Sequence, residues 1–314
     1  MMSHCQCILC KSNDVSSVET IRVNDLTSLY QRLFQINVAS EFSDIKEVFF
    51  LHCQNCDLYF FYPLVEATEK LYVSLQKFDW YYPKEKDEYE VALRFINQND
   101  RVLEIGCGEG YFAGKGKFNS YTGLEFNKAA VEKAQSNGLK VLGASIESFC
   151  LNNEEQYDAV CAFQVMEHVA NLEEFIACCR KCLRDKGLLI YSVPNVDSFV
   201  SLGTNNALNM PPHHMTWWTE KCLRNLPQYF HLELVSLEKD VLQEAHQRYY
   251  LSVLIYRSLK KDKKNSAVLI DLSLYSKFLW MISWRLSALM MKGIKDPRMA
   301  PRGQSITAVY RKIR

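Results

Sequence analysis

From Arg101 onward, short apolar runs alternate with segments of helical spacing, and this alternation constrains the fold more than any other feature. Helical spacing is clearest at 128–136 and 172–183, between runs rich in β-branched and aromatic residues. Strands that alternate with helices form a parallel sheet covered on both faces, so the sequence predicts an α/β domain. A further helix is expected at 219–227, and the candidate strands are 102–105, 121–126, 139–142, 157–163, 188–193, 231–237 and 305–311.

The composition favours a globular protein that does not coat a polyanion. At about 150 residues per domain, 314 residues favour roughly two domains. Lys and Arg number 37 against 36 Asp and Glu, so the net charge is +1 and we expect no stable nucleic-acid partner. Twelve cysteines in a chain that opens without an apolar signal segment favour the reducing cytoplasm. No apolar run is long enough to predict a transmembrane helix.

A glycine-rich turn follows the first strand of the alternation, with Gly106, Gly108 and Gly110 in a G-x-G-x-G pattern. Glycines let a ligand approach the backbone without a Cβ in the way. A dinucleotide site would place its third glycine where Tyr111 stands, and no Lys-Ser/Thr follows to make a phosphate loop. Both of these sites are therefore disfavoured.

An acidic residue, Glu125, follows the next strand about 20 positions after the turn. A carboxylate in this place can accept hydrogen bonds from both hydroxyls of a ribose. The alternative is a solvent-facing glutamate at the end of a strand. Together with the glycine turn, the carboxylate favours a cofactor that carries a nucleoside.

Over about 80–260 and the last strand, the chain resembles the class I S-adenosylmethionine-dependent methyltransferases. The resemblance implies a Rossmann-like, doubly wound, seven-stranded and mostly parallel sheet, with S-adenosylmethionine as the cofactor. Five segments stand in the order of that family: V-L-E-I-G-C-G-E-G-Y-F-A at 102–113, G-L-E-F-N at 123–127, G-A-S-I-E-S-F at 143–149, Y-D-A-V-C-A-F-Q-V-M-E-H-V at 157–169 and L-R-D-K-G-L-L-I-Y-S-V-P-N at 183–195.

The resemblance assigns cofactor-binding roles to eleven residues. The methionine moiety falls to Glu104 and the loop, the ribose to Glu125, and the adenine to the next positions. This chain has Ser145 where the family often has an acidic residue, and the short stretch from Gly110 to Tyr121 leaves little room for a first helix. The assigned residues are Glu104, Gly106, Cys107, Gly108 and Gly110 (methionine), Glu125 (ribose), Phe126, Ser145 and Ile146 (adenine), and Phe163 and Gln164 (methionine amine).

Three histidines are the candidate catalytic residues. His168 follows the fourth strand, and His213 and His214 follow the fifth, in P-P-H-H-M-T-W-W-T at 211–219. A histidine suits proton abstraction near neutral pH, and indoles can enclose a substrate. The alternative for His168 is a bracing role before the next helix.

A metal-assisted reaction is the second hypothesis for this region. Small-RNA 3′-end methyltransferases and the ubiquinone-pathway O-methyltransferase have a Glu-x-x-Glu-His pattern that contributes to a divalent-metal site. Here Gln164 replaces the first glutamate of that pattern, before Glu167 and His168. Loss of a carboxylate weakens a site for a hard cation, so we rank base or proximity catalysis first.

Two cysteine pairs predict a structural zinc site, Cys7-x2-Cys10 and Cys53-x2-Cys56, with 42 residues between them. Four thiolates leave no open position for catalysis. Cys5 is a spare ligand, and the alternative is buried cysteines in a small β-sheet. The pairs resemble the N-terminal zinc ribbon of bacterial saccharide and natural-product methyltransferases, which implies a sugar-type substrate.

The chain divides into four parts by these criteria. We expect a small zinc-binding β module at 1–65, a helical connector at 66–100, a methyltransferase domain at 101–265 and 300–314, and a helical insertion at 266–299 before the last strand. The apolar stretch 267–292 suits buried packing, a homodimer face, a lid or contact with a membrane surface.

The sequence thus predicts a cytoplasmic S-adenosylmethionine-dependent methyltransferase with an N-terminal zinc module. It would methylate an oxygen or carbon of a small-molecule acceptor such as a nucleotide- or lipid-linked sugar. One alternative is a divalent-metal-assisted O-methyltransferase acting on an RNA end or a quinone-like ring. The other is an inactive zinc-containing adaptor, against which Glu104, the glycines and Glu125 argue.

Overall fold

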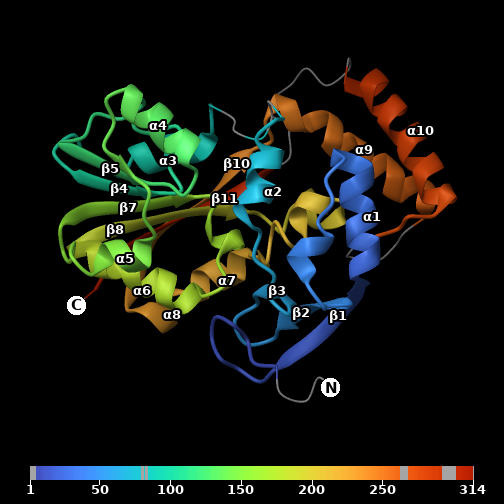
Figure 1. Cartoon of the computed structure of the whole chain (residues 1–314), viewed down its shortest axis with the longest axis horizontal. Helices are drawn as coiled ribbons and strands as arrows, with labels where there is room; N and C mark the ends of the chain where they lie inside the picture. The colour runs from blue at the N-terminus through green and yellow to red at the C-terminus, as the bar shows by residue number, and fades with distance from the viewer. Residues whose placement is uncertain (1–4, 79–80, 82–83, 262–267, 292–301, 314) are drawn as a thin grey trace.

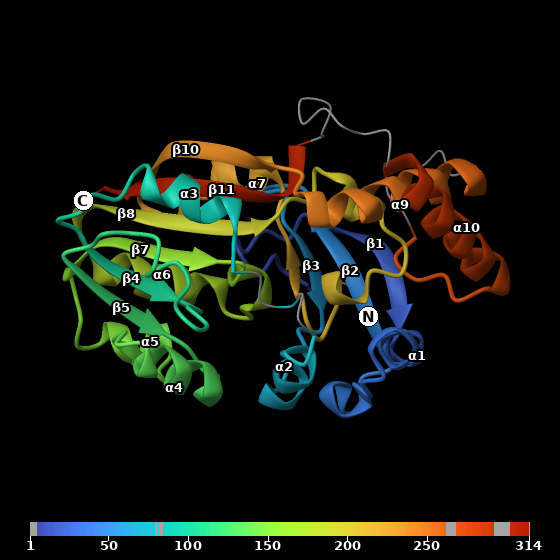
Figure 2. The same ribbon diagram turned by 90° about the horizontal axis from the view of Figure 1, so that it is seen from above.

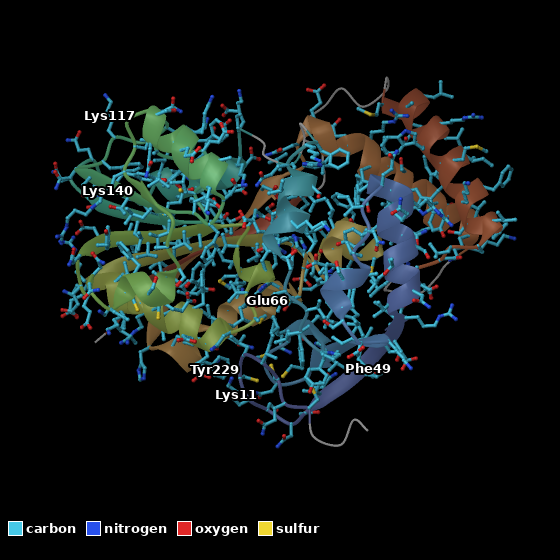
Figure 3. All side chains as sticks on the ribbon, in the orientation of Figure 1. Lys11, Phe49, Glu66, Lys117, Lys140 and Tyr229 are labelled. Carbon is cyan, nitrogen blue, oxygen red and sulfur yellow. The ribbon has the colours of Figure 1, made fainter. Side chains whose placement is uncertain are left out.

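The computed structural model describes residues 5–78, 81, 84–261, 268–291 and 302–313. A seven-stranded sheet forms one side of the molecule and a four-stranded sheet the other, with a helical hairpin at the far edge (Figures 1 and 2). Side chains fill the space between these parts (Figure 3).

The large sheet has the strand order β10-β11-β8-β7-β4-β5-β6. Its pairs are parallel except at β11, which runs antiparallel to both neighbours. The prediction of a Rossmann-like, mostly parallel seven-stranded sheet is confirmed. The strands are β4 (Arg101–Ile105), β5 (Ser120–Leu124), β6 (Val141–Leu142), β7 (Tyr157–Phe163), β8 (Leu183–Pro194), β10 (Leu232–Val241) and β11 (Arg302–Lys312).

The central strand β7 is buried along its whole length because helices cover both faces of the sheet. Val160 and Ala162 pack into the core cluster that includes α6, and the alternate residues Ala159 and Cys161 pack into the cluster that includes α3. This period of two is what a strand between two helical layers requires. The covering helices are α3 (Asp87–Leu93), α4 (Lys128–Ser136), α5 (Ile146–Cys150) and α6 (Leu172–Cys182).

Two segments of the large domain, after the glycine loop and after β9 (Thr216–Trp217), can be compared with the expectations from the sequence. The glycine loop leads into turns over 108–115 rather than into a helix, as the short spacing before Tyr121 predicts. The single helix expected at 219–227 is instead two short ones, α7 (Glu220–Asn225) and α8 (Pro227–Phe230). Pro227 stands at the first position of α8, where its missing N–H costs nothing.

The small sheet combines the N-terminal segment with a distant one. Its order is β1-β2-β3-β9, and β9 comes from the segment that follows β8. Phe50, Phe61 and Trp217 share its core with Leu26 and Tyr30 of α1. The elements are β1 (Val15–Arg22), α1 (Val23–Phe34), η1 (Ala39–Phe42), β2 (Glu47–Cys53), β3 (Tyr59–Tyr62), α2 (Glu69–Leu75) and β9 (Thr216–Trp217).

Between β10 and β11 the chain forms a hairpin of two helices, α9 (Glu244–Lys260) and α10 (Leu274–Met290). The hairpin lies at the edge of the molecule opposite β5, with α10 outermost (Figures 1 and 2). No helix in the described ranges has the length and hydropathy to cross a membrane. Three short 3₁₀ turns, η2 (Met166–His168), η3 (Phe199–Leu202) and η4 (Ala207–Asn209), lie in the loops after β7 and β8.

Candidate active site and metal centre

The glycine loop turns sharply at the carboxyl end of β4. Gly106, Gly108 and Gly110 have φ values of 68°, 54° and 81°, a region that side chains with a Cβ rarely adopt. A Cβ on Gly106 would also lie 2.7 Å from Cγ2 of Val165. The loop therefore needs glycine, and at the edge where α/β sheets bind nucleosides Gly106 is exposed, whereas Gly108 and Gly110 are buried.

Glu125 directly follows β5 and lies against this loop. Its Oε2 accepts a hydrogen bond of 2.9 Å from the N–H of Gly108, and its Oε1 accepts one of 2.9 Å from the N–H of Asn127. The side chain is partly exposed, and each oxygen keeps a further lone pair. The carboxylate is thus held in place and can still accept two hydroxyl groups.

Glu104 is buried on β4, close to the loop. The hydroxyl of Tyr121 donates a 2.5 Å hydrogen bond to its Oε2. Burial raises the pKa of Glu104 to about 8, a rise that the Tyr121 bond and Lys86 moderate. The group is therefore mostly neutral at pH 7, and a ligand cation beside it would favour its ionised form.

The remaining predicted cofactor residues differ in exposure. Phe126 is 73% exposed beside Glu125, where its ring is free to cover a base. Ser145 caps α5 by accepting a hydrogen bond from the N–H of Ser148, and Ile146 is buried. Cys107, within the loop, is also buried.

The two residues predicted beside the methionine amine lie differently. Phe163 packs against Tyr89 and Phe112 in the core on the α3 face, so only its backbone borders the loop edge. Gln164 has a φ of 59° and turns its amide to the hydroxyl groups of Ser192 and Ser305, at 3.0 and 3.3 Å.

The three predicted catalytic histidines meet in one cluster. Their ring centroids lie 4.6–4.8 Å apart, although His168 and the other two come from different loops. The N–H of Met215 donates to the carbonyl of Glu167 and joins the loops. Burial lowers the pKa of His168 to about 4 and those of His213 and His214 well below the usual value, so all three rings are neutral.

The hydrogen bonds of the cluster give each ring a different role. His213 donates from Nδ1 to the carbonyl of Leu208 and accepts at Nε2 from the hydroxyl of Tyr81, each over 2.8 Å. His168 donates from Nδ1 to the carbonyl of His213 over 2.6 Å, so its Nε2 holds a lone pair. His213 has no free nitrogen, which disfavours it as a base.

His214 is the histidine that reaches a cavity. Its Nδ1 lies 3.1 Å from Oδ1 of Asn209, a hydrogen bond that leaves the lone pair on Nε2. Oε1 of Glu167 lies 4.0 Å from that Nε2. Burial raises the pKa of Glu167 to about 8, and its other oxygen, Oε2, is buried with no hydrogen-bond partner among the described residues.

The cavity has a volume of about 170 Å³ and lies between Gln164, which follows β7, and Tyr249 of α9. At roughly 10–15 Å³ for each water molecule, it has room for on the order of ten waters. Buried Tyr249 Oη and Asn209 Nδ2 have no hydrogen-bond partner in the described part of the chain. Seven of its ten lining residues have polar side chains: Gln164, Asn206, Asn209, His214, Tyr249, Gln304 and Ser305, beside Pro194, Val200 and Leu208.

Sequence reasoning missed several of these residues, including Asn209, Tyr249 and Gln304. Asn209 had a local signal, since it lies five residues before His214 and close to the unusual Pro-Pro-His-His run. Tyr249 and Gln304 had none, because they come from segments that only the fold brings to this place.

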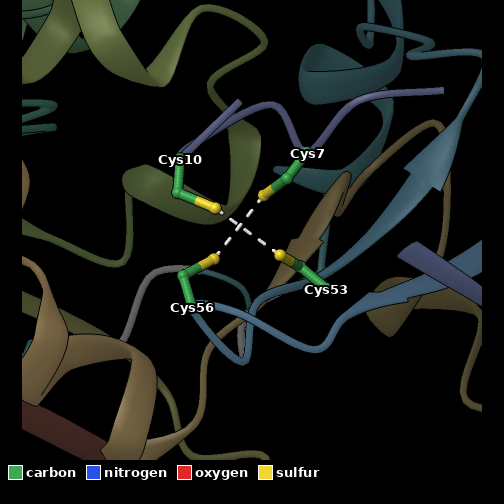
Figure 4. Close-up of side chains that lie close together, drawn as sticks. All are labelled: Cys7, Cys10, Cys53 and Cys56. Atoms are coloured by element: carbon green, nitrogen blue, oxygen red, sulfur yellow. Dashed lines mark hydrogen bonds between the residues drawn. The ribbon is translucent and has the colours of Figure 1, made fainter. Parts of the chain in front are cut away.

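Four cysteines form the candidate metal centre (Figure 4). Cys7 Sγ lies 3.5 Å from Cys56 Sγ, and Cys10 Sγ lies 3.5 Å from Cys53 Sγ. All four sulfur atoms lie within 4.8 Å of one another. Bonds of about 2.3 Å in a tetrahedron would place thiolates ~3.8 Å apart, so the donor set fits Zn²⁺. Cys5 lies outside this group.

The thiol cluster is joined to the large domain. Asn55 donates hydrogen bonds to Cys10 Sγ and to the hydroxyl of Tyr229 on α8, which is labelled in Figure 3. Cys222 of α7 is buried in the same hydrophobic cluster as Cys7, Cys53 and Cys56. The N-terminal cysteines are therefore part of a shared interior.

The strand order, the glycine loop and the carboxylate of Glu125 define a nucleoside-binding α/β domain of the methyltransferase class. The model of a family described as a methyltransferase domain matches residues 80–237, half of the chain. The protein belongs to this methyltransferase-domain family.

Individual proteins agree with this assignment. The ubiquinone biosynthesis O-methyltransferase of Rickettsia prowazekii is 35% identical over 120 residues, which are 34% of this chain and 47% of that protein. The mitochondrial ubiquinone biosynthesis O-methyltransferase of Dictyostelium discoideum is 28% identical over 154 residues, 41% of this chain and 47% of that protein. This chain thus spans about half the length of the curated relatives it matches.

The fold is also that of a solved structure. The S-adenosylmethionine-dependent methyltransferase of Archaeoglobus fulgidus superimposes with a TM-score of 0.50 over 78% of this chain and 100% of that one, at 17% identity.

Proposed function

We propose that the protein transfers a methyl group from S-adenosylmethionine to a hydroxyl group of a small polar acceptor bound beside His214. The observation that carries this proposal is the cavity, since Gln164 from the cofactor edge and His214 both line it. An acceptor there would lie between Gln164, which the resemblance places beside the methionine amine, and a candidate base.

The residues present fit the cofactor. Glu125 would accept the ribose hydroxyls, Phe126 would cover the adenine, and buried Glu104 would balance the positive charge of the methionine amine. When bound, S-adenosylmethionine supplies a methyl group that is already activated by its sulfonium. The protein then has to hold the acceptor in line and exclude water.

His214 can assist by accepting the proton of the acceptor hydroxyl. Its Nδ1–H bond to Asn209 directs the Nε2 lone pair away from the backbone, and its low pKa keeps the ring neutral. A protonated ring would favour ionisation of Glu167, whose pKa is about 8 and whose Oε1 lies 4.0 Å from Nε2, and the carboxylate so formed would stabilise the charge of the ring.

The polar side chains that line the cavity favour an acceptor rich in hydroxyl groups, such as a nucleotide- or lipid-linked sugar. Most small-molecule pockets are largely apolar, and a quinone-like ring would suit such walls. Here the unpartnered Tyr249 Oη and Asn209 Nδ2 instead offer hydrogen bonds to a ligand. The named activity of the Rickettsia relative supports oxygen as the methylated atom.

Transfer of a labelled methyl group to a panel of sugar nucleotides, glycosides and catechols tests the proposal. We expect a hydroxyl-rich acceptor to be methylated. The His214→Asn variant should lose about 10²–10⁴-fold in turnover with unchanged cofactor affinity. His231→Asn, at an exposed histidine, is the matched control. Methylation of the catechols alone would contradict the acceptor class, and full turnover in His214→Asn would contradict the base.

A divalent-metal-assisted O-methyltransferase is the second candidate. Nitrogens of His168, His213 and His214 lie within 4.8 Å of one another, and Oε2 of Glu167 is unpartnered beside them. His213 would first have to give up its bond from Tyr81. Turnover that is lost on chelation and restored by added Mn²⁺ or Mg²⁺ would favour this candidate, provided that elemental analysis shows zinc still bound.

We also propose that Cys7, Cys10, Cys53 and Cys56 hold a structural Zn²⁺. Two sulfur–sulfur distances of 3.5 Å, the 4.8 Å limit on all of them and the burial of Cys7, Cys53 and Cys56 support it. A four-thiolate site has no open position, so this metal would stabilise the fold and take no part in the reaction.

A further inference from the structure

The outward face of α10 is apolar. Leu274 is 84% exposed, Leu289 66% and Phe278 54%. Tyr275, Met281, Trp284 and Met290 are exposed on the same helix, which also forms the outer edge of the molecule (Figures 1 and 2). A contiguous apolar surface of this kind marks an interaction site.

The inward face of α10 is, by contrast, lined with serines. Its fully buried residues are Ser276, Ser283, Ser287 and Leu279. Ser276 Oγ and the hydroxyl of Tyr256 lie 2.7 Å apart, and Ser252 of α9 donates to Ser287 Oγ over 3.0 Å. Small hydroxyl residues therefore form the seam between the two helices.

This polarity is the reverse of that in a helix whose outer side faces water. In water, the apolar residues of a surface helix turn inward and its polar residues outward. Small residues in the seam and large apolar residues outside are the arrangement of helices packed in lipid. The serine face of α10 packs against α9, so the exposed apolar face is the one available to contact an apolar phase.

The charge of the hairpin indicates which kind of surface the apolar face of α10 would bind. From the start of α9 to the end of α10, residues 244–290 contain eight Lys or Arg and three Asp or Glu, a net charge of +5 in a chain whose total is +1. Lys277 and Arg285 are exposed beside the apolar residues of α10, which has no acidic residue. In a homodimer built on this face, basic groups would meet basic groups. An anionic surface is complementary to them.

We propose that the α9–α10 hairpin docks the protein on an anionic lipid membrane, with the outer face of α10 at the boundary between headgroups and acyl chains. Aromatic residues flanked by Lys and Arg suit that boundary. The same hairpin contributes Tyr249 to the acceptor cavity, and Tyr249 stacks on Trp280 of α10. Docking would therefore bring the cavity close to the lipid surface.

Co-sedimentation of the full chain with lipid vesicles tests the proposal. We expect binding to vesicles of phosphatidylcholine with phosphatidylglycerol, and weaker binding to phosphatidylcholine alone or at high salt. The double variant Phe278→Asp, Leu289→Asp should reduce binding by about tenfold or more, because two apolar side chains would no longer enter the bilayer. Leu151→Asp, at a 66% exposed leucine of the large domain, should bind as the wild type does.

Circular dichroism and S-adenosylmethionine affinity would check that the double variant is folded. Failure of the wild type to bind anionic vesicles at low salt would overturn the proposal, as would full binding by the double variant. A dimer in sedimentation velocity that the double variant dissociates, together with no vesicle binding, would show that this face meets a second copy.

Discussion

Asp57, one residue after the second cysteine pair, accepts a 2.8 Å hydrogen bond at Oδ2 from the hydroxyl of Thr219. Thr219 also caps α7 by accepting a bond from the N–H of Cys222. A little further along the chain, Tyr59 and Phe60 of β3 pair with Trp217 and Thr216 of β9. The candidate metal centre is therefore joined to the segment that carries the histidines.

This connection predicts that zinc stabilises more than residues 1–65. Elemental analysis should find about one zinc per chain, and Cys53→Ser should lower that content. Hydrogen exchange should then become faster in the N-terminal sheet and also over 213–226. Cys178→Ser, outside the thiol cluster, should leave both readouts unchanged. Protein purified without chelator that contains no zinc would refute the site.

The raised pKa of Glu104 leads us to expect that cofactor affinity depends on pH. Its pKa is about 8 in the free protein, and a bound cation would lower it. Binding then releases a proton below pH 8, so affinity should rise about tenfold per pH unit toward 8 and level off above it. Calorimetry in buffers of different ionisation enthalpy should detect the proton near pH 7. Glu104→Gln should abolish that release, and a wild type that releases no proton would contradict the assignment.

Because Asn209 bonds to His214, we expect substitutions at Asn209 and at Asn206 to affect turnover and acceptor binding differently. The variant Asn209→Leu removes the acceptor for His214 Nδ1–H, so kcat should fall by about tenfold or more. Asn206→Leu alters the same cavity without touching His214 and should mainly raise KM. Steady-state kinetics with the methylated acceptor separates the two effects. Equal losses of the same kind in both variants would argue against a role for Asn209 in positioning His214.

The large sheet was predictable because each of its strands carries a local signal. Tyr157–Phe163 is a run of seven residues in which only Asp158 is charged, and β7 has the same bounds. β9 carries no such signal. It has two residues and pairs with a strand more than 150 positions away, so only the folded chain defines it.

The site was predictable in part for the same reason. Residues in ordered motifs, such as Glu104 and Glu125, could be named, although their roles stay predictions. The sequence grouped His168, His213 and His214 by chemistry, but their different bonding depends on Tyr81, Leu208 and Asn209. Those contacts arise from packing between loops, which periodicity does not encode.

Titration of the purified protein with S-adenosylmethionine tests the central claim most directly, because it needs no acceptor. The wild type should bind one equivalent. Glu125→Ala should bind about 1.5–3 kcal/mol more weakly, roughly 10- to 150-fold, since a charge-assisted bond to the ribose is lost. Glu132→Ala, at an exposed glutamate of α4, should bind as the wild type does. A wild type that does not bind S-adenosylmethionine, or a Glu125→Ala variant with unchanged affinity, would contradict the account.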